Sequence, residues 1–540
     1  MIPIKNKLLI FIRKVFRRKT TYFLKEYKKV EKNMHNTTKK DNIIVTPFKF
    51  DNSHIFEAIY SRKAILEGVN VYAFLCGQGV NKCEKICIFD KLKKIRCDFC
   101  YIEQTEFVRQ FGVFPYYLNN ELMENDKVLI NQTIEDYFQK PEFSNIFMGV
   151  NIKTILKSAL QRYYLKADPN MDDNHITRGF LNTILSTIIV LDRLCAKVNP
   201  KYVLSSHGTY SSWGAIVEYC KNKKIPVVVW GTVYNNGGIY FSNNESCIVD
   251  AVFGSDEEWQ NKELSTKQES TIKDFLKMRT GQNTRFIFDY NKNQKDQLTR
   301  EEICKKTGIP ERAKIVGMFP NIPWDASIDG SIMGDTVAFN SYLEWLSTTL
   351  NYFEKRKDIY LIIRTHPAEN DLNSNKETLM DLIYQIYEVL PKNIIILPAE
   401  SAINSFALGK VSVFGIYYCS TIGMELTYLG VPLVCAGPSP LKNKGIVYDA
   451  KSMKEYIDLL ERGIRGELVV TNENKNCLLK FGYYHMFTRV MPQTFFEYDD
   501  EGGFKNLLFD SEKEIKENKV LDHLYQTINN QGRYSFDKFY

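Results

Sequence analysis

Residues 411–436 read VSVFGIYYCSTIGMELTYLGVPLVCA, and this stretch has the pattern of a strand, a helix and a second strand. Its apolar ends, Val411–Phe414 and Pro432–Ala436, fit buried strands, and Thr421–Leu429 between them has helical spacing. A glycine and a proline follow the helix and stop it. Two strands that are joined through a helix lie parallel in one sheet. The stretch therefore predicts one unit of a doubly wound α/β domain.

The same alternation extends upstream of this stretch. From residue 314 onward, strands and amphipathic helices alternate as far as residue 436. An earlier series runs from Ile43–Val45 to Ile225–Trp230, and a charged, polar segment separates the two series. We expect two doubly wound domains that bracket a ligand-binding cleft. The predicted divisions are a basic amphipathic arm at 1–40, a first Rossmann-like domain at 41–255, a helical linker at 256–310, a second Rossmann-like domain at 311–475, and a crossover helix and tail at 476–540.

The positive charge of the chain is concentrated at its N-terminus. Of the 540 residues, 44% are hydrophobic and 25% are charged, which is typical of a globular protein. Residues 1–40 hold thirteen Lys or Arg against Glu26 and Glu31, although the whole chain carries a net charge of only +7. The rest of the chain is therefore slightly acidic, and we expect it to bind no nucleic acid.

The arm has apolar residues at helical spacing among its basic residues, as in Ile4, Leu8 and Phe11. Such a helix can lie on an anionic membrane surface, so residues 1–30 are a candidate for peripheral attachment. The alternative is a basic arm that packs on its own body. No apolar run reaches the ~20 residues of a membrane span, and Leu181–Leu191 fits a buried helix. We expect a cytoplasmic protein, with peripheral attachment to the inner face of the plasma membrane as a hypothesis.

Several cysteines lie close together in the first predicted domain. Cys97 and Cys100 have the two-residue gap of a zinc-binding pair, and Cys83 or Cys87 could complete the set. The alternative is that these thiols are small buried hydrophobes, which cytosolic cysteines commonly are. A structural zinc is therefore one of two interpretations, and we expect no cofactor in the chemistry itself.

The polar residues at the predicted strand ends of the second domain suit a phosphate group. Arg364 and His366 follow an apolar strand, and both an arginine fork and a histidine donor bind phosphate oxygens. Ser420 and Thr421 precede a helix whose N-terminus attracts anions, and Glu425 stands one turn further on. The alternatives are simple helix capping by Ser420 and Thr421 and an ordinary loop position for His366.

Three motifs in the second domain carry a resemblance to a known family. They are FPNIPWDA at 319–326, RTHPAE at 364–369 and STIGMELTYLGVPL at 420–433. In order and spacing they resemble the bacterial capsule polysaccharide synthesis family, GT-B glycosyltransferases of surface polysaccharides that include Kdo-transferring lipid-linker enzymes. The resemblance covers about residues 301–440. It implies an α/β, GT-B-like fold with two facing Rossmann-type domains, a central cleft and a C-terminal crossover helix.

The resemblance also implies roles for particular residues. It implies that Arg364 and His366 contact the donor phosphate and that His366 is catalytic as well. It places Ser420 and Thr421 on phosphate and Glu425 on the ribose. The residues that it implies for the wall of the cleft are Asn321, Trp324 and Asp325.

Two histidines are candidates for the acceptor side of the cleft. His54 follows the first predicted strand, and His207 precedes Gly208, which permits close approach of a ligand. We favour His207 as the catalytic residue on this side, whereas His54 fits a surface position equally well.

These observations favour transfer of a sugar from a CMP- or UDP-linked donor to a surface polysaccharide or a lipid-linked glycan. No Asp-x-Asp motif stands at a strand end of the second domain, which fits a metal-independent reaction. Polyol-phosphate transfer, nucleotide-sugar epimerisation and a non-catalytic GT-B scaffold stay open as alternatives. An NAD-dependent enzyme is disfavoured, because no G-x-G-x-x-G follows any strand.

Overall fold

The computed structural model describes residues 24–31, 41–48, 54–86, 93–140, 145–233, 237–254, 258–281, 298–325, 337–369, 376–498 and 504–540. Most of the predicted membrane-binding arm lies outside these described residues. The chain divides into two compact units. The first comprises Met1–Ala159, Met171–Cys247 and Phe487–Tyr540, and the second comprises Leu160–Asn170 and Ile248–Met486.

The first unit contains a seven-stranded sheet in the order β15-β8-β7-β6-β1-β2-β3. The strands from β7 to β3 are parallel, while β8 pairs antiparallel with both of its neighbours. The strand order reverses beside β1, which lies between β2 and β6, and ligands bind beyond the carboxyl ends of strands at such a switch point. The strands are β1 (Asn42–Val45), β2 (Asn70–Leu75), β3 (Phe114–Tyr117), β6 (Val203–Ser206), β7 (Val227–Thr232), β8 (Ile239–Asn243) and β15 (Val490–Met491).

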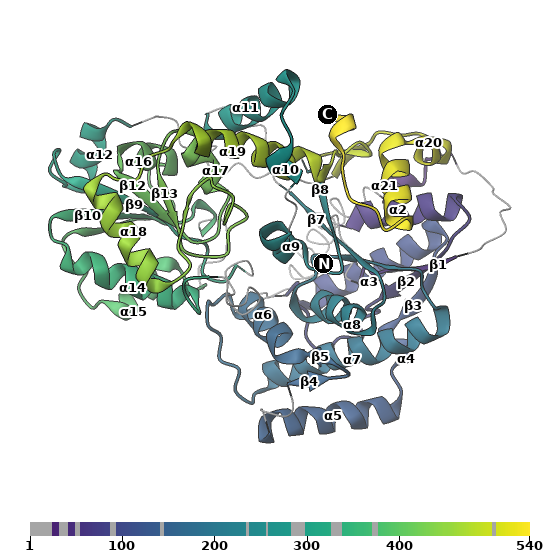
Figure 1. Cartoon of the computed structure of the whole chain (residues 1–540). Coiled ribbons are helices and arrows are strands. Elements are labelled where there is room, and N and C mark those ends of the chain that lie inside the picture. The colour runs from purple at the N-terminus through teal and green to yellow at the C-terminus, as the bar shows by residue number, and fades with distance from the viewer. Residues whose placement is uncertain are drawn as a thin grey trace, which may run out of the picture. The chain divides into compact units, whose positions relative to one another are not determined.

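Helices cover both faces of this sheet. One face carries α2 together with the C-terminal helices α20 and α21, and the other carries α7 and α8 (Figure 1). Among the described helices, α7 alone is long and apolar enough to cross a membrane, but 78% of its apolar window is buried inside the protein, as the sequence predicts for Leu181–Leu191. The helices are α2 (Ile55–Leu66), α3 (Lys93–Phe111), α4 (Leu118–Glu121), α5 (Glu124–Gln139), α6 (Ile152–Tyr164), α7 (His175–Val198), α8 (Ala215–Lys223), α20 (Glu512–Glu517) and α21 (Lys519–Asn529).

The C-terminal segment Phe487–Tyr540 shares the core of the first unit, and the described end of the basic arm packs against it. The Tyr27 hydroxyl donates to one oxygen of the buried Glu512 at 2.9 Å, and Arg62 pairs with the other oxygen at 2.5 Å. Opposite charge and hydrogen bonds satisfy this buried carboxylate. Residues 24–31 are therefore part of the folded body rather than of a solvated arm.

The second unit contains a six-stranded parallel sheet in the order β11-β10-β9-β12-β13-β14. Here the strand order reverses beside β9, which lies between β10 and β12. Near-continuous apolar runs such as IYLII in β10 suit strands that are covered on both faces. The strands are β9 (Lys314–Phe319), β10 (Ile359–Arg364), β11 (Ile394–Leu397), β12 (Phe414–Tyr417), β13 (Leu433–Cys435) and β14 (Tyr448–Asp449).

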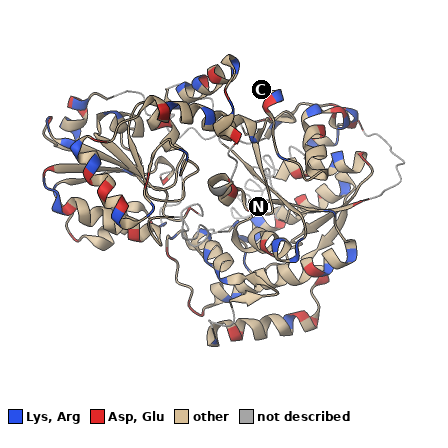
Figure 2. Ribbon diagram, viewed as in Figure 1, with Lys and Arg blue, Asp and Glu red and all other residues tan. Residues whose placement is uncertain are grey.

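On one face of this sheet, α14, α15 and α18 bury their apolar sides, and α16 and α17 lie on the other face (Figure 1). Charged residues lie mostly on helices and turns of both units, and the central strands carry few of them (Figure 2). The helices are α9 (Cys247–Phe253), α10 (Glu258–Asn261), α11 (Thr266–Thr280), α12 (Arg300–Thr307), α14 (Tyr342–Lys355), α15 (Leu379–Ile386), α16 (Ser405–Val411), α17 (Ile422–Tyr428), α18 (Met453–Arg465) and α19 (Asn472–Tyr483).

The division of the chain differs from the predicted one in three places. The C-terminal segment of the first unit begins at Phe487, and not at residue 476. The second unit begins at Ile248, and α11 packs on α17 and α19, so the described part of the predicted linker 256–310 belongs to that unit. The segment Leu160–Asn170 also belongs to the second unit, although it lies in the first half of the sequence. It contacts residues that are far away in the sequence, such as Glu377, and local sequence patterns do not predict such contacts.

The predicted strand Val411–Phe414 is wrong by several residues. Val411 ends helix α16, and β12 begins only at Phe414. Asn404 caps this helix by accepting a hydrogen bond from the Ala407 backbone N–H at 2.7 Å. The helix therefore includes Val411, although the apolar run that begins at this residue predicted a strand.

Candidate functional site

One asparagine ties together the carboxyl ends of β9 and β12. Asn321 is buried, and its side-chain oxygen accepts from the Cys419 backbone N–H at 2.9 Å while its side-chain nitrogen donates to the Cys419 carbonyl. The Tyr342 hydroxyl donates to the Asn321 carbonyl at 3.0 Å. Because both ends of the amide are engaged, Asn321 fixes the switch point of the sheet. It does not offer a ligand the side chain that the resemblance implied.

Arg364, the last residue of β10, is committed to the protein backbone. It is 2% exposed, and its Nη1 donates to the carbonyls of Thr365 and Pro398 at 2.8 Å each. Its Nη2 donates to the Ala399 carbonyl at 3.1 Å. Burial lowers the pKa of Arg364 to about 10. The fork that the sequence assigns to a donor phosphate therefore holds the loop after β11 against the end of β10.

His366 is half-buried just beyond the end of β10. Its Nδ1 accepts a hydrogen bond from the Ala368 backbone N–H at 3.1 Å, so the ring proton resides on Nε2. The 3-10 turn Pro367–Glu369 supplies this N–H. Burial, and to a lesser extent the charge of Arg364, lowers the pKa of His366 to about 4. At neutral pH the ring is therefore uncharged, with Nε2 in the donor form.

The segment before α17 departs from the predicted phosphate site. The helix has only 7 residues, and Ser420 Oγ already accepts from the Ile422 backbone N–H at 3.3 Å. Thr421 makes no side-chain cap, and its hydroxyl accepts from Arg279 Nη2 at 3.4 Å. A helix of this length gathers little dipole at its end. Ser420 thus has the local capping role that the sequence offered as the alternative.

Glu425 is 3% exposed and is paired with a residue that the sequence analysis missed. Arg279 on α11 approaches Glu425 Oε1 to 2.6 Å through Nη2 and to 2.7 Å through Nε. The other oxygen, Oε2, is buried and has no hydrogen-bond partner among the described residues. A buried carboxylate needs a compensating charge, so burial of Glu425 would have predicted a basic partner. The pattern around Arg279 indicated only a polar linker.

Trp324 and Asp325 follow β9 at the same edge of the sheet. The guanidinium of Arg162 lies over the Trp324 ring, 5.6 Å from the ring centroid. The indole Nε1 of Trp324 is buried and has no partner in the described part of the chain. The Asp325 backbone N–H donates to the Ile322 carbonyl at 3.1 Å and closes the turn. Arg162 comes from the first half of the sequence, where nothing indicated a place at this edge.

The last residue of RTHPAE is a buried carboxyl group. Glu369 Oε2 accepts from the Leu379 backbone N–H at 3.3 Å, while Oε1 has no partner among the described residues. Burial raises the pKa of Glu369 to about 7, although the Leu379 N–H and Lys376 act in the opposite direction. This carboxyl therefore exchanges its proton near neutral pH, which is common at functional sites and in buried cores alike.

In the first unit, His207 follows β6 in a left-handed turn. Its φ is 55°, which a non-glycine residue adopts only at a cost. Its Nδ1 is hydrogen-bonded to Ser206 Oγ, and its ring stacks on Trp213 with the centroids 5.1 Å apart. A Cβ at Gly208 would lie 2.9 Å from Ser246 Cα. Gly208 thus permits close packing of the chain on itself, and not on a ligand as we expected.

His54 is fully buried, so the surface interpretation of this residue is wrong. Its ring stacks on Trp213 at 5.9 Å and meets Trp230 edge-on at 6.2 Å. His54 and His207 follow different strands, yet both contact the same indole. Because β1 and β6 are neighbours at the switch point, the two predicted acceptor-side histidines converge in the first unit.

A buried carboxylate that the sequence analysis missed supports this cluster. Glu84 is 2% exposed; its Oε1 accepts from the Ser212 hydroxyl at 2.5 Å, and its Oε2 accepts from the Ser211 hydroxyl. Both serines lie in the π-helical turn Tyr210–Gly214, which also carries Trp213. π-Helical turns occur frequently at functional sites. Glu84 directly follows Cys83, one of the cysteines considered for zinc, and its neighbours in the sequence do not indicate this role.

The cysteine cluster provides no metal centre in the described part of the chain. No group of three or more His, Cys, Asp or Glu side chains suited to a metal ion occurs there. Cys97 and Cys100 are half-buried on α3, where Gln78 and Gln104 approach their sulfur atoms to 3.7 Å. Cys87 lies outside the described residues. The structural-zinc interpretation therefore finds no ligand set among these residues.

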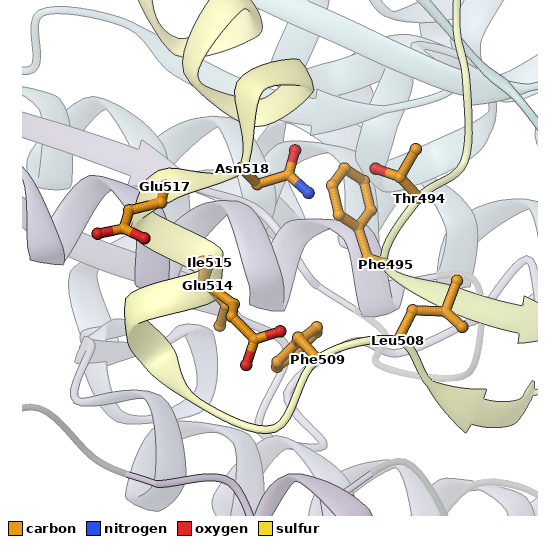
Figure 3. A pocket seen from close by; sticks show the side chains of 8 residues that line it. All are labelled: Thr494, Phe495, Leu508, Phe509, Glu514, Ile515, Glu517 and Asn518. Atoms are coloured by element: carbon orange, nitrogen blue, oxygen red, sulfur yellow. The ribbon is translucent and has the colours of Figure 1, made fainter.

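A separate pocket lies in the C-terminal part of the first unit (Figure 3). Its polar side chains already serve the local backbone. Glu514 Oε1 accepts from the Ser511 backbone N–H at 3.1 Å, and Asn518 Oδ1 caps α21 through two backbone N–H groups at 3.0 Å. The pocket is lined by Thr494, Phe495, Leu508, Phe509, Glu514, Ile515, Glu517 and Asn518. It lies apart from the strand ends of the sheet, and we assign no function to it.

The architecture can now be compared with known proteins. The chain has two Rossmann-like units, each built on a sheet of parallel strands with helices on both faces, and a C-terminal segment that belongs to the first unit. The fold is GT-B-like. No family model matches the chain, and no curated protein matches it.

Several solved structures are similar to the chain. One is the KpsC β-Kdo 2,4 transferase of Thermosulfurimonas dismutans, with 12% identity over 54% of this chain and 80% of that chain and a TM-score of 0.33. A glycosyltransferase from Rickettsia africae is 11% identical over 83% of this chain and 93% of that chain, with a TM-score of 0.26. The S. aureus MnaA–UDP structure is 10% identical over 91% of this chain and 97% of that chain, with a TM-score of 0.27. Such low TM-scores carry no argument about the site.

Proposed function

We propose that the protein is a glycosyltransferase that moves a sugar from a nucleotide-sugar donor to a surface polysaccharide or lipid-linked glycan acceptor. The observation that carries the proposal is the state of His366. The residue is held at the carboxyl end of β10, next to the switch point, as a neutral ring whose Nδ1 is an acceptor. A fixed neutral donor at this edge suits an oxygen on which charge develops.

In this proposal, His366 acts on the leaving phosphate. Cleavage of the bond between sugar and phosphate leaves negative charge on a phosphate oxygen, and a hydrogen bond from Nε2 stabilises that charge more in the transition state than in the bound donor. The Ala368 backbone N–H, at 3.1 Å from Nδ1, fixes the direction of the ring. No reorganisation is then needed as the bond breaks. The residues so assigned require no metal ion.

Glu425 is proposed to bind the ribose of the donor. Arg279 holds its Oε1 at 2.6 Å, and the buried Oε2 keeps acceptor capacity. A ribose hydroxyl that donates to Oε2 would satisfy an atom that is otherwise left without a partner.

On the acceptor side, His207 is proposed as the base. When Nδ1 donates to Ser206 Oγ, Nε2 is unprotonated and can accept the proton of an attacking hydroxyl. Trp213, which Glu84 positions through the neighbouring serines, is buried and supports the His207 ring by stacking. His54 contacts the same indole and is proposed to orient it.

The proposed location is the cytoplasm, with residues 1–30 on the inner face of the plasma membrane. This part of the proposal rests on the basic amphipathic pattern of the arm alone. Deletion of residues 1–23 should release the protein from anionic vesicles while its donor affinity is unchanged. Vesicle binding that survives the deletion would remove the membrane from the proposal.

A donor screen tests the proposed function. The purified protein is titrated with CMP- and UDP-linked sugars by calorimetry, and release of free nucleotide is followed with and without a glycan acceptor. The proposal expects a saturable donor whose nucleotide is released faster when acceptor is present. An intact nucleotide-sugar that returns with an epimerised sugar would favour an epimerase, and binding of none of the donors would favour a scaffold.

A further inference from the structure

The short segment Leu160–Asn170 is built into the second unit. The Ala167 backbone N–H donates to Glu377 Oε2 at 2.9 Å, and the Glu377 backbone N–H donates to the Leu165 carbonyl at 3.2 Å. Ala167 lies in the apolar core of that unit. Gln161 closes the turn by donating to the Ala167 carbonyl at 2.8 Å. These contacts hold the end of α6 in a defined place.

That placement brings Arg162 to the strand ends of the second sheet. Its guanidinium lies 5.6 Å from the centroid of Trp324, which follows β9. Among the described residues, Arg162 has no carboxylate partner and only this aromatic contact. A cation–π contact engages no N–H group of the guanidinium in a hydrogen bond, so these groups can still donate to a ligand.

The other arginines discussed at this edge are already engaged. Arg364 donates to three backbone carbonyls, and Arg279 is paired with the buried Glu425. Arg162 therefore differs from both in having its donor edge available. A nucleotide-sugar is an anion that has to be bound by cationic or N–H groups, and arginine matches the planar oxyanion geometry.

We infer that Arg162, in cation–π contact with Trp324, binds an oxyanion of the nucleotide-sugar donor. This inference rests on the proposed function. The oxyanion is either a phosphate of the nucleotide or the carboxylate of an acidic sugar, since both present two oxygens to one guanidinium fork. The segment Leu160–Asn170 thereby supplies a donor-binding residue to the second unit from the first half of the chain.

The test measures binding by calorimetry for the wild type, Arg162→Met and Lys166→Met. Methionine keeps an apolar stem on the indole and removes the charge, and Lys166 is an exposed cation in the same segment. Arg162→Met should lower the affinity for the nucleotide-sugar donor roughly ten- to a hundredfold, the loss typical of charge-assisted hydrogen bonds. Lys166→Met should bind as the wild type does, and uridine or cytidine should bind equally to all three proteins.

Two further arms locate the oxyanion. An equal loss of affinity for free CMP and for a CMP-linked acidic sugar assigns Arg162 to the phosphate. A loss confined to the acidic sugar nucleotide, with UDP and a UDP-linked neutral sugar unaffected, assigns it to the sugar carboxylate. Either result supports the inference. Arg162→Lys keeps the charge without the planar fork, and its affinity should lie between those of the wild type and Arg162→Met.

The inference and the proposed function fail in different ways. If the wild type binds a nucleotide-sugar and Arg162→Met binds every nucleotide and nucleotide-sugar as the wild type does, the inference is overturned while the proposed function stands. If the wild type binds no nucleotide or nucleotide-sugar, both are overturned. Arg162→Met should melt within about 2 °C of the wild type, because an exposed cation–π contact contributes only about 0.5–1 kcal/mol. If Arg162→Met fails to fold, the test uses Arg162→Lys alone. An affinity of Arg162→Lys for the nucleotide-sugar that equals that of the wild type then overturns the inference.

Discussion

The strand ends of the two sheets are built in opposite ways. In the second unit, contiguous motifs supply the residues, and most of them are locked to the backbone: Arg364 to three carbonyls, Asn321 to Cys419. In the first unit, residues from separate segments meet around one indole, with His54 and His207 on Trp213. The comparison teaches that residues of a recognisable motif can serve the frame of the sheet edge, as Arg364 and Asn321 do.

The largest expected effect tests whether Arg364 belongs to that frame. Arg364→Met removes the side-chain donor from the carbonyls of Thr365 and Ala399 and leaves the Pro398 carbonyl with the Ser401 N–H alone, so it should lower the free energy of unfolding of the second unit by about 4 kcal/mol. Urea unfolding with separate fitting of the two units measures it. Arg465→Met is the control, because Arg465 is exposed and pairs with the exposed Glu467, and this variant should be as stable as the wild type. If Arg364→Met is as stable as this control and yet loses nucleotide binding, Arg364 is a ligand residue after all.

The next effect is a pH dependence that arises at the same edge. The folded pKa of Glu369, about 7, lies above the value of about 4.3 for a free carboxyl. The folded state therefore holds the proton more tightly, and stability is lost as the pH rises from about 4.3 to 7. His366 acts in the opposite direction, because its folded pKa is about 4, so stability rises with pH between 4 and about 6.5. The Glu369 contribution must therefore be read from a variant.

The variant Glu369→Gln isolates the contribution of Glu369 to the pH dependence of stability. The stability of this variant relative to the wild type should increase by about 3 kcal/mol between pH 4.5 and pH 7.5, because glutamine has no proton to lose. Urea unfolding at a series of pH values measures the difference. A difference that stays constant over this range would show that Glu369 is not held protonated by its burial.

The smallest effect concerns the first unit. Glu84→Gln replaces one acceptor oxygen by a donor amide that faces the hydroxyls of Ser211 and Ser212, so the first unit should lose about 1–2 kcal/mol of stability. Glu124→Gln, at an exposed carboxylate on α5, should change stability by less than about 0.5 kcal/mol. Equal stabilities of the two variants would mean that the cluster around Trp213 does not depend on Glu84.

The sequence predicts the sheets of this fold better than it predicts the site. Long apolar runs such as Ile359–Arg364 identify buried strands, because only burial on both faces favours such runs. Periodicity could not predict that Leu160–Asn170 joins the second unit or that Arg279 pairs with Glu425, since those contacts join residues far apart in the chain. The motif RTHPAE predicted that His366 lies at the end of β10, but it did not predict that Arg364 donates to backbone carbonyls. Spacing in the sequence does not show which carbonyls surround a side chain.

The central claim is that His366 stabilises charge on the leaving phosphate. The most direct measurement is the turnover rate at saturating donor for His366→Ala and His366→Gln, together with donor affinity for both. Glutamine can place an N–H close to the position of Nε2, whereas alanine cannot. The account predicts that alanine lowers the turnover rate on the order of 10²–10³-fold, that glutamine restores part of it, and that donor affinity changes little. Full activity and full affinity in His366→Ala would contradict the account.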